Sequence, residues 1–257
     1  MDKALLRVDE LKKTYRRGMA EVDAVRGVSI EVAESEIFGI VGESGSGKST
    51  LLRLIAGMET ASSGSIIFDN EDIRGLSVSG YHTLYRKLQM VFQSPATSFD
   101  PRMTIRRSIY EPLRNLCGIR TERELNERAC ELFDMVGLDP ALLDRYSFEI
   151  SGGQCQRAAI ARAVSVRPKL LLCDEATSAL DVTAQANVVE LLCNLSRNLN
   201  MGILFVSHDI ALVSNICRRS IVMRRGVCEE CGLTKDLIGD PKTDYTKQLI
   251  SSATMAI

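Results

Sequence analysis

The chain has 257 residues, 45% of them hydrophobic and 25% charged, which is enough for one large α/β domain or a core with one inserted subdomain. Its 32 Lys and Arg against 33 Asp and Glu leave a net charge of −1, which weighs against nucleic acid as the main partner. No apolar run approaches the ~18 residues that a membrane span needs. The N-terminus "MDKALLRVDELKK" lacks the apolar segment of a signal peptide, so we expect a cytosolic chain that can dock on a membrane component.

The chain opens with "LLRVDELKKTY" and "VDAVRGVSIEV", whose apolar and polar residues alternate as in half-exposed antiparallel strands. The run "EIFGIVG" does not alternate and predicts a strand buried on both faces. A glycine-rich turn follows, and "STLLRLIAG" predicts a helix that ends at Gly57. The runs "LQMVFQ", "KLLLCDE", "GILFVSHD" and "SIVM" predict further strands, and a helix is expected over Val182–Leu199. Short strands alternating with helices indicate an α/β fold with a mostly parallel sheet.

Residues 94–166 have few β-branched runs and several helical patterns. One helix should begin at "TERE", where Thr121 and Glu124 form a capping box, and end at Gly137. We therefore expect a helical subdomain over 94–166, inserted into a discontinuous α/β core formed by 1–93 and 167–257.

The stretch "GESGSGKST" matches the phosphate-loop pattern G-x-x-x-x-G-K-[ST] between a predicted buried strand and a helix. Its backbone N–H groups would wrap phosphates, Lys48 would reach the β- and γ-phosphates, and the Ser49 hydroxyl would bind Mg²⁺. An ordinary glycine-rich turn does not explain a lysine followed by two hydroxyls. The loop residues expected to contact the nucleotide are Gly42, Glu43, Ser44, Gly45, Ser46, Gly47, Lys48, Ser49 and Thr50.

Polar residues follow three other predicted strands at their carboxyl ends, where ligands bind in open α/β sheets. Asp174 and Glu175 come after "LLLC"; the first would hold Mg²⁺ and the second would orient or deprotonate the attacking water. His208 would bond a γ-phosphate, and Gln93 would contact Mg²⁺ or its water. Taken singly, the acidic pair could be a helix N-cap, and His208 and Gln93 could each be polar strand ends.

A second glycine-rich helix start lies in "ISGGQCQR", about a hundred residues after the first. Ser151 is the expected N-cap, and Gly152 and Gly153 have poor helix propensity, so close approach by an anion would explain them. Because this turn belongs to the helical insert, we expect Ser151–Gln154 of one subunit to cover the γ-phosphate bound by another.

Eight cysteines are scattered along the chain, and a cytosolic location favours reduced thiols over disulfides. Cys228 and Cys231 form a C-x-x-C in "GVCEECG", a spacing also used by metal and redox sites. A zinc site needs two more ligands at compatible spacing, and none is evident. Two thiols in a surface strand and turn are the favoured interpretation.

The motifs "GESGSGKST", "VFQ", "ISGGQCQR", "LLLCDEATSALD" and "SHD", in this order, make the chain resemble the ATP-binding subunit of an ABC transporter over almost its whole length. The resemblance implies a P-loop NTPase core with an N-terminal antiparallel β subdomain and an inserted α-helical subdomain. It implies ATP and Mg²⁺ as ligands. ATP is expected over GTP, although a stacking aromatic reads no base edge strongly, and no guanine-reading N-K-x-D motif is present.

The resemblance also assigns roles at this chain's own positions. Gln93 would be the Q-loop residue, and Asp181 would lie between the two sites of a dimer. Tyr15 would stack on adenine, although local packing of a strand aromatic remains an alternative. The signature motif acting across the dimer would be Ser151, Gly152, Gly153 and Gln154, with Asp174 as the magnesium ligand, Glu175 as the base and His208 as the switch histidine.

Finer likeness in "VFQSPATSFDPRMT" and in the tail "DPKTDYTKQLI" is similar to the dipeptide, oligopeptide and nickel importer branch. The chain departs from that pattern at Ser35, in "YSFE", at Ile150 and at Cys155, none of which is an expected catalytic group. The branch implies transmembrane permease subunits, a second ATP-binding subunit that is identical or paralogous, and, indirectly, an extracytoplasmic solute-binding protein.

We therefore expect an ATPase on the cytoplasmic face of the membrane that powers solute import, with the transported solute left open. One alternative is a non-transport ATPase acting on DNA, although the long coiled-coil insertions of such proteins are missing from this sequence. The other is a nucleotide-binding accessory subunit without turnover, which the presence of Glu175 and His208 disfavours.

Overall fold

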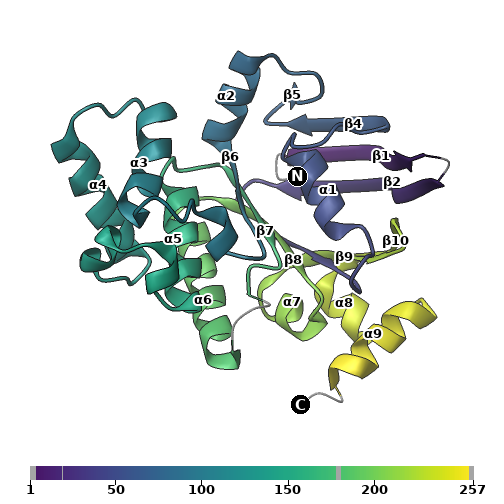
Figure 1. Ribbon diagram of the computed structural model, residues 1–257. Helices are drawn as coiled ribbons and strands as arrows, with labels where there is room; N and C mark the ends of the chain where they lie inside the picture. The colour runs from purple at the N-terminus through teal and green to yellow at the C-terminus, as the bar shows by residue number, and fades with distance from the viewer. Residues whose placement is uncertain (1–3, 19, 178–180, 255–257) are drawn as a thin grey trace. The chain divides into compact units, whose positions relative to one another are not determined.

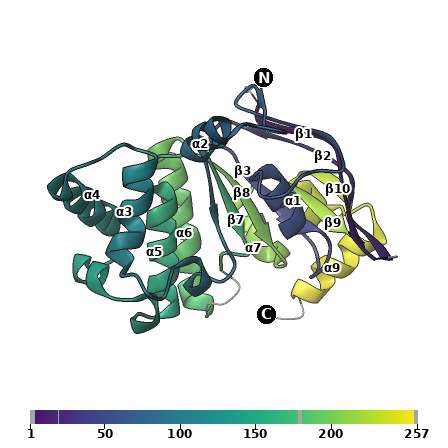
Figure 2. The same ribbon diagram turned by 45° about the horizontal axis from the view of Figure 1, so that its top comes forward.

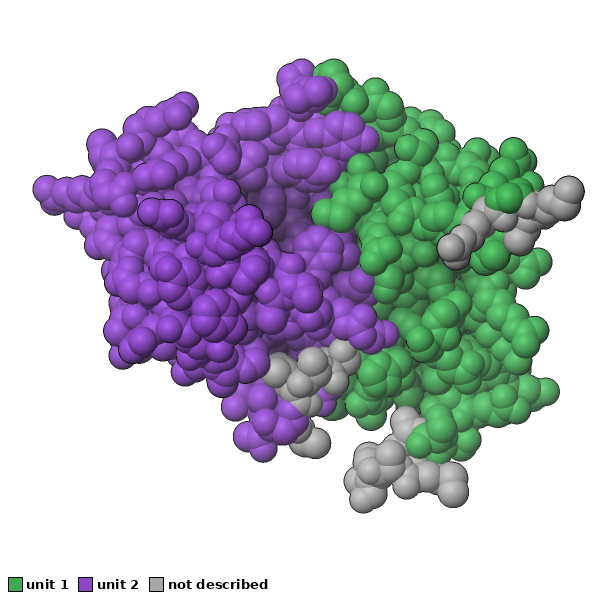
Figure 3. Space-filling view, in the orientation of Figure 1, with its two compact units in different colours: residues 1–77, 202–257 green, residues 78–201 purple. Residues whose placement is uncertain are grey.

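The computed structural model describes residues 4–18, 20–177 and 181–254. The chain divides into two compact units, residues 1–77 with 202–257 (unit 1) and residues 78–201 (unit 2), coloured separately in Figure 3. The sequence-based bounds of the helical insert, 94 and 166, lie inside unit 2 and stay a prediction. In the described ranges no helix is both long and apolar enough to cross a membrane.

Unit 1 contains two sheets and four helices among its described residues. Its elements are β1 (Ala4–Arg17), β2 (Ala20–Ala33), β3 (Ile37–Val41), α1 (Lys48–Ile55), β4 (Ser63–Phe68), β5 (Glu71–Asp72), β8 (Gly202–Ser207), α7 (Ile210–Ile216), β9 (Arg219–Arg224), β10 (Val227–Leu233), α8 (Thr234–Gly239) and α9 (Asp244–Thr254). The helices α8 and α9 both contact β10, as Figure 1 shows.

The antiparallel sheet of unit 1 has the strand order β2-β1-β4-β5. Leu6 and Val8 are buried while Arg7 between them is exposed, so the predicted alternation of a half-exposed strand is confirmed. A bulge between Val8 and Leu11 interrupts the β1–β2 register, with Glu10 at a φ of 45°.

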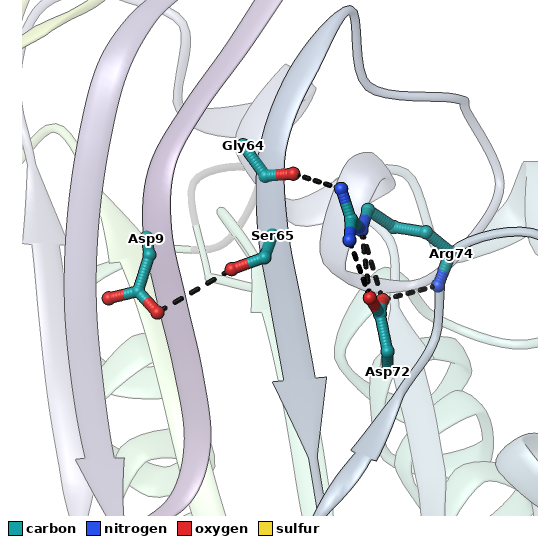
Figure 4. A network of polar contacts seen from close by, with 5 residues as sticks. All are labelled: Asp9, Gly64, Ser65, Asp72 and Arg74. Atoms are coloured by element: carbon teal, nitrogen blue, oxygen red, sulfur yellow. Dashed lines mark hydrogen bonds and ion pairs between the residues drawn. The ribbon is translucent and has the colours of Figure 1, made fainter.

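The side chain of Arg74 links the short strand β5 to β4 (Figure 4). Arg74 Nε donates to the Asp72 carboxylate at 3.0 and 3.2 Å, and its Nη1 donates to the carbonyl of Gly64 on β4. The Ser65 hydroxyl on the same strand donates to Asp9 of β1 at 3.5 Å. The guanidinium holds the pKa of Asp72 below its ordinary value. The contacts tie the edge of this sheet to its interior strands.

The second sheet of unit 1 has the order β10-β9-β3-β8, in which β3 is parallel to both β8 and β9. Strands β3 and β8 carry continuous apolar runs because helices or strands cover both their faces; Phe38 and Phe205, for example, are almost fully buried. The helix after β3 ends at Ile55 and is followed by Gly57 at a φ of 67°, as the sequence predicts.

Unit 2 is a helical body with a pair of strands. Its elements are α2 (Val78–Lys87), β6 (Leu88–Val91), η1 (Ala96–Ser98), α3 (Ile105–Asn115), α4 (Glu122–Met135), η2 (Pro140–Asp144), η3 (Ser147–Glu149), α5 (Gly152–Val164), β7 (Leu170–Asp174) and α6 (Val182–Leu199). Strands β6 and β7 pair in parallel, and α3, α4 and α5 pack on one another (Figures 1 and 2).

The helix α4 follows its sequence pattern closely. The Thr121 hydroxyl accepts a hydrogen bond from the backbone N–H of Glu124 at 3.3 Å, which confirms the N-cap. Its apolar stripe is buried, with Leu125, Leu132 and Phe133 at zero exposure. Together with the parallel strands, these helices confirm the predicted α/β fold class.

Candidate functional site

In unit 1 the glycine-rich loop connects the carboxyl end of β3 to the first residue of α1. Strand β3 is flanked by parallel strands on both sides, and α1 is anchored by Leu51, Leu52 and Ile55, which are fully buried. A buried strand and a buried helix therefore fix both ends of the loop. The backbone N–H groups of the first helical turn lie next to the loop, which is the arrangement that binds phosphate.

Lys48 lies inside this loop, only 4% exposed. Its Nζ donates to the carbonyl oxygens of Gly42 at 2.7 Å and Glu43 at 2.8 Å and lies 3.5 Å from the Ser46 hydroxyl. The loop thus surrounds the ammonium group of Lys48. A phosphate bound there would contact both this group and backbone N–H groups.

The back of the loop is closed by two neighbouring segments. The N–H of Gly226, in the turn between β9 and β10, donates to the carbonyl of Ser46 at 2.9 Å. The carbonyl of Gly226 accepts from the N–H of Arg26 on β2 at 2.7 Å. A Cβ on Gly47 would lie 2.3 Å from the carbonyl oxygen of Ala24 on the same strand. Backbone contacts therefore fix the loop from behind.

Tyr15 on β1 lies beside this loop and is 36% exposed. Its hydroxyl donates to the Glu59 carboxylate and also interacts with the Thr50 side chain at the start of α1. Burial raises its pKa, and Glu59 raises it further, while Thr50 acts in the opposite direction. The Nζ of Lys13 lies 4.9 Å from the ring centroid. The structure thus brings the tyrosine to the phosphate loop, while its contact with adenine stays a prediction.

His208 is exposed and directly follows β8. In the parallel register Val41 pairs with Ser207, so His208 and the first loop residue, Gly42, leave adjacent strands at the same level. The next residue, Asp209, caps α7 by accepting from the N–H of Ala211 at 2.8 Å. The chain direction at His208 is therefore fixed on both sides, by a strand and a capped helix.

In unit 2, the ends of β6 and β7 bring together the predicted water-activating residues. Their register pairs Val91 with Cys173, and two positions later the Gln93 Nε2 donates to Glu175 Oε2 at 2.9 Å. Asp174 is the last residue of β7 and is 5% exposed. Glu175 has a φ of 46°, a left-handed conformation that costs about 1–2 kcal/mol for a residue with a side chain.

The second glycine-rich turn, at the start of α5, is also formed as predicted. The Ser151 hydroxyl accepts from the N–H of Gln154 at 3.3 Å, and Gln154 Oε1 accepts from the N–H of Ser151 at 3.0 Å. A Cβ on Gly152 or Gly153 would meet none of the described atoms within 4 Å. The described part of the chain itself therefore gives no steric reason for glycine at these positions.

Asp181 is exposed and caps α6, where its carboxylate accepts from the N–H of Ala184 at 2.9 Å. The three preceding residues of "SALD" lie outside the described residues. The predicted site residues thus form groups within each unit: the loop, Tyr15 and His208 in unit 1, and Gln93 with Asp174 and Glu175 in unit 2.

Sequence reasoning missed Tyr245, whose hydroxyl accepts a hydrogen bond from the N–H of Glu43 in the phosphate loop at 3.2 Å. The only signal for it was the tail motif "DPKTDYTKQLI", which carries no local indication of a contact with residue 43.

The cysteine pair lies on β10, and burial raises the pKa of the Cys228 thiol to about 11. Near neutral pH that thiol is protonated, the form that does not bind metals. Over the described ranges no cluster of three or more His, Cys, Asp or Glu side chains could hold a metal ion. The pair gives no support for a zinc site.

The family model described as ABC transporter matches residues 25–178. The oligopeptide transport ATP-binding protein OppF of Salmonella typhimurium is 40% identical over 245 residues, which are 95% of this chain and 73% of that protein. The Escherichia coli protein of the same name is 42% identical over 229 residues, 89% of this chain and 69% of that protein.

Among solved structures, the fold is similar to the ATP-binding cassette MJ0796 in its dimeric post-hydrolysis state with ADP and Pi. The TM-score is 0.82 at 29% identity, covering 89% of this chain and 98% of that one. The match of family model, sequence and fold agrees with the phosphate loop and the Gln93–Glu175 pair. The chain belongs to the ABC transporter family, as one of its ATP-binding subunits.

Proposed function

We propose that the chain hydrolyses ATP to ADP and phosphate and thereby powers import of a small solute, peptides first, through separate membrane subunits. The observation that carries the hydrolytic part is the 2.9 Å contact between Gln93 and Glu175 beside the buried Asp174. Gln93 orients the carboxylate of Glu175, which is suited to accept a proton, and the adjacent carboxylate of Asp174 is suited to bind a cation. The peptide part is supported by the names of the OppF relatives.

ATP would be bound mainly through its phosphates in unit 1. The N–H groups from Gly45 to Thr50 and the ammonium group of Lys48 would bind the β- and γ-phosphates. The aromatic ring of Tyr15, half-exposed and held by Glu59, would stack on the adenine. Stacking does not read base edges strongly, so phosphate contacts would supply most of the affinity.

The oxygen donors of the site suit Mg²⁺, which is bound through one or two carboxylates together with phosphates and water. Asp174, the Ser49 hydroxyl and the side-chain oxygen of Gln93 would hold it. The cation would neutralise charge on the phosphates during the reaction.

In the hydrolytic step, Glu175 would orient a water molecule and accept its proton as the water oxygen bonds to the γ-phosphorus. The bond from that phosphorus to the β–γ bridging oxygen breaks, and ADP leaves with the electron pair. Gln93 holds one Glu175 oxygen at 2.9 Å and so restricts where the carboxylate points. His208 and Lys48 would stabilise the charge that develops on the phosphoryl oxygens.

A second ATP-binding subunit would complete each site. Within the described residues no atom lies within 4 Å of a Cβ placed on Gly152 or Gly153, so the N–H groups at the start of α5 can approach an anion from outside the chain. We propose that Ser151, Gly152, Gly153 and Gln154 of one subunit cover the γ-phosphate bound by the other, with Asp181 between the two sites. The subunits would be identical or paralogous.

The remaining partners follow from the import function. Transmembrane permease subunits would dock near residues 94–103, which begin three positions after β6 and directly follow Gln93. The chain would then be peripheral on the cytoplasmic face of the membrane, and an extracytoplasmic solute-binding protein would act through the permease. Nucleic acid is not a proposed partner.

The test is the Glu175→Gln variant, studied by light scattering with and without Mg-ATP beside phosphate release by the unmodified chain. The variant should bind ATP, lose hydrolysis by about 10²–10⁴-fold and double in mass with Mg-ATP. The control Lys48→Ala should bind ATP weakly and stay monomeric. A chain that never releases phosphate, even with its membrane partners, would contradict the proposal. A Glu175→Gln monomer that still binds ATP would point to a missing partner, either a paralogous ATP-binding subunit or the membrane subunits.

A further inference from the structure

The stretch "DPKTDYTKQLI" near the C-terminus leads into α9 of unit 1 and forms its first turns. Tyr245 on this helix is 4% exposed. Its hydroxyl accepts from the N–H of Glu43 at 3.2 Å, 202 positions earlier in the chain. The tail therefore touches the phosphate loop itself.

The start of α9 is held firmly in place by a strand. The Glu230 carboxylate on β10 accepts hydrogen bonds from the backbone N–H groups of Lys242, at 3.2 Å, and Thr243. Burial alone would raise the pKa of Glu230, but these hydrogen bonds outweigh it and lower the pKa, so the carboxylate is charged. The Thr243 hydroxyl accepts from the N–H of Thr246 at 3.2 Å, which caps the helix.

The ring of Tyr245 is also fixed. The guanidinium carbon of Arg224 on β9 lies 4.6 Å from the ring centroid, within cation–π distance. With α9 clamped by Glu230 and the ring covered by Arg224, the hydroxyl has little freedom to leave Glu43.

The peptide groups of Glu43 link this tyrosine to the loop lysine. The N–H of Glu43 donates to Tyr245, and its carbonyl accepts from Lys48 Nζ at 2.8 Å. A rotation of this segment would change the position of the ammonium group. Without the hydroxyl, the N–H would lose its partner and the segment would lose one of its restraints.

We propose that Tyr245 is a positioning residue for the phosphate loop: through Glu43 it keeps Lys48 arranged for the phosphates before nucleotide binds. The inference rests on the proposed function, since it assumes that the loop binds ATP. Preorganisation lowers the cost of binding, so its loss weakens affinity. Once bound, the phosphates themselves hold Lys48, so the chemical step depends less on Tyr245.

The test is Tyr245→Phe in the full chain, with Kd measured for a fluorescent ATP analogue and KM and kcat for ATP. The Kd and KM should rise about three- to tenfold, as for one lost hydrogen bond, while kcat changes less than twofold. Glu230→Gln, which loosens α9 without touching the tyrosine, should shift Kd in the same direction by a smaller factor. Amide hydrogen exchange at Glu43 should be faster in Tyr245→Phe.

The matched control is Tyr110→Phe on α3, another tyrosine at 4% exposure, whose hydroxyl interacts with Arg106. Its free energy of unfolding should fall about as much as that of Tyr245→Phe, while its Kd and KM should stay those of the unmodified chain. Equal Kd values for Tyr245→Phe and this control would overturn the proposal. Failure of the unmodified chain to bind the analogue would instead contradict the proposed function.

Discussion

The two glycine-rich helix starts of this chain have glycines for different reasons. In the phosphate loop, a Cβ on Gly42 or Gly47 would lie 2.2 or 2.3 Å from a backbone carbonyl oxygen, closer than real Cβ atoms come. At the start of α5, a Cβ on Gly152 or Gly153 would meet none of the described atoms within 4 Å. One set of glycines is explained by the chain's own packing, and the other is not.

The phosphate loop and the start of α5 therefore differ in whether the chain's own structure requires glycine. Gly47 also has a φ of 104°, so its backbone requires glycine independently of the crowding. Gly153 is within a helix, where glycine is less favourable than alanine by about 0.5–1 kcal/mol. A stability cost without an internal steric cause favours an external contact, as the proposed second subunit would make.

The largest effect is expected for Gly47→Ala. The added methyl group meets the Ala24 carbonyl oxygen at 2.3 Å and is strained by the positive φ, so the free energy of unfolding should fall by about 2–4 kcal/mol. ATP binding should weaken by more than tenfold, because the loop can relieve the clash only by moving. Urea unfolding and a titration with the fluorescent analogue measure both.

The control for this loss is Gly64→Ala on β4, where the Cβ would lie 2.5 Å from the Glu10 carbonyl oxygen at a φ of 95°. It should lose similar stability and, under conditions where it is folded, bind ATP normally. Equal weakening of ATP binding in both variants would show that Gly47→Ala acts through general unfolding.

Gly153→Ala should separate stability from activity. Because the methyl group would meet none of the described atoms and alanine favours helix, the free energy of unfolding should rise by about 0.5 kcal/mol. ATPase activity should fall about 10- to 100-fold, because the methyl group would stand between the α5 N-terminus and the partner's γ-phosphate. Thermal unfolding and phosphate release are the two measurements.

Gly239→Ala, at the end of α8 and also free of described neighbours within 4 Å, is the matched helical control. It should be as stable as the unmodified chain or slightly more so, with unchanged ATPase activity. Normal activity of Gly153→Ala would remove the argument for an external anion at this turn.

The sequence predicted those parts of the fold and site that depend on neighbouring residues. The phosphate loop, the strand ends at Asp174 and His208, and the N-cap at Ser151 each combine a local pattern with a local structure. The helix α2 was missed because its single buried side chain, Leu84, leaves no apolar stripe in the sequence.

Contacts between residues far apart in the chain could not be predicted from local sequence patterns. Tyr245 reaches Glu43 across 202 positions, and the Gly226 turn touches Ser46 across a similar gap. Glu175 takes a left-handed φ although its residue type does not favour it, because the strand end and Gln93 hold it there. Such features come from tertiary packing, which overrides local preference.

Ser151→Ala tests the same turn with a smaller expected effect. Loss of the N-cap should lower the free energy of unfolding by about 1 kcal/mol. ATPase activity should fall about tenfold, since the hydroxyl also orders the N–H groups proposed to face the phosphate. Thr121→Ala, which removes the equivalent cap from α4, should cost the same stability and leave ATPase activity intact. Equal activity in the two variants would assign Ser151 a structural role alone.

The smallest effect is expected at Gly45, where a positive φ of 78° coincides with open space within the described residues. Gly45→Ala should cost about 1 kcal/mol of stability from backbone strain alone, and raise the Kd for ATP about threefold because the methyl group stands at the loop's open face. Gly118→Ala has the matching geometry in unit 2, with a φ of 74° and no described neighbour within 4 Å, and should cost the same stability without changing that Kd. An equal Kd in the two variants would mean that the phosphates do not approach the loop from the side of Gly45.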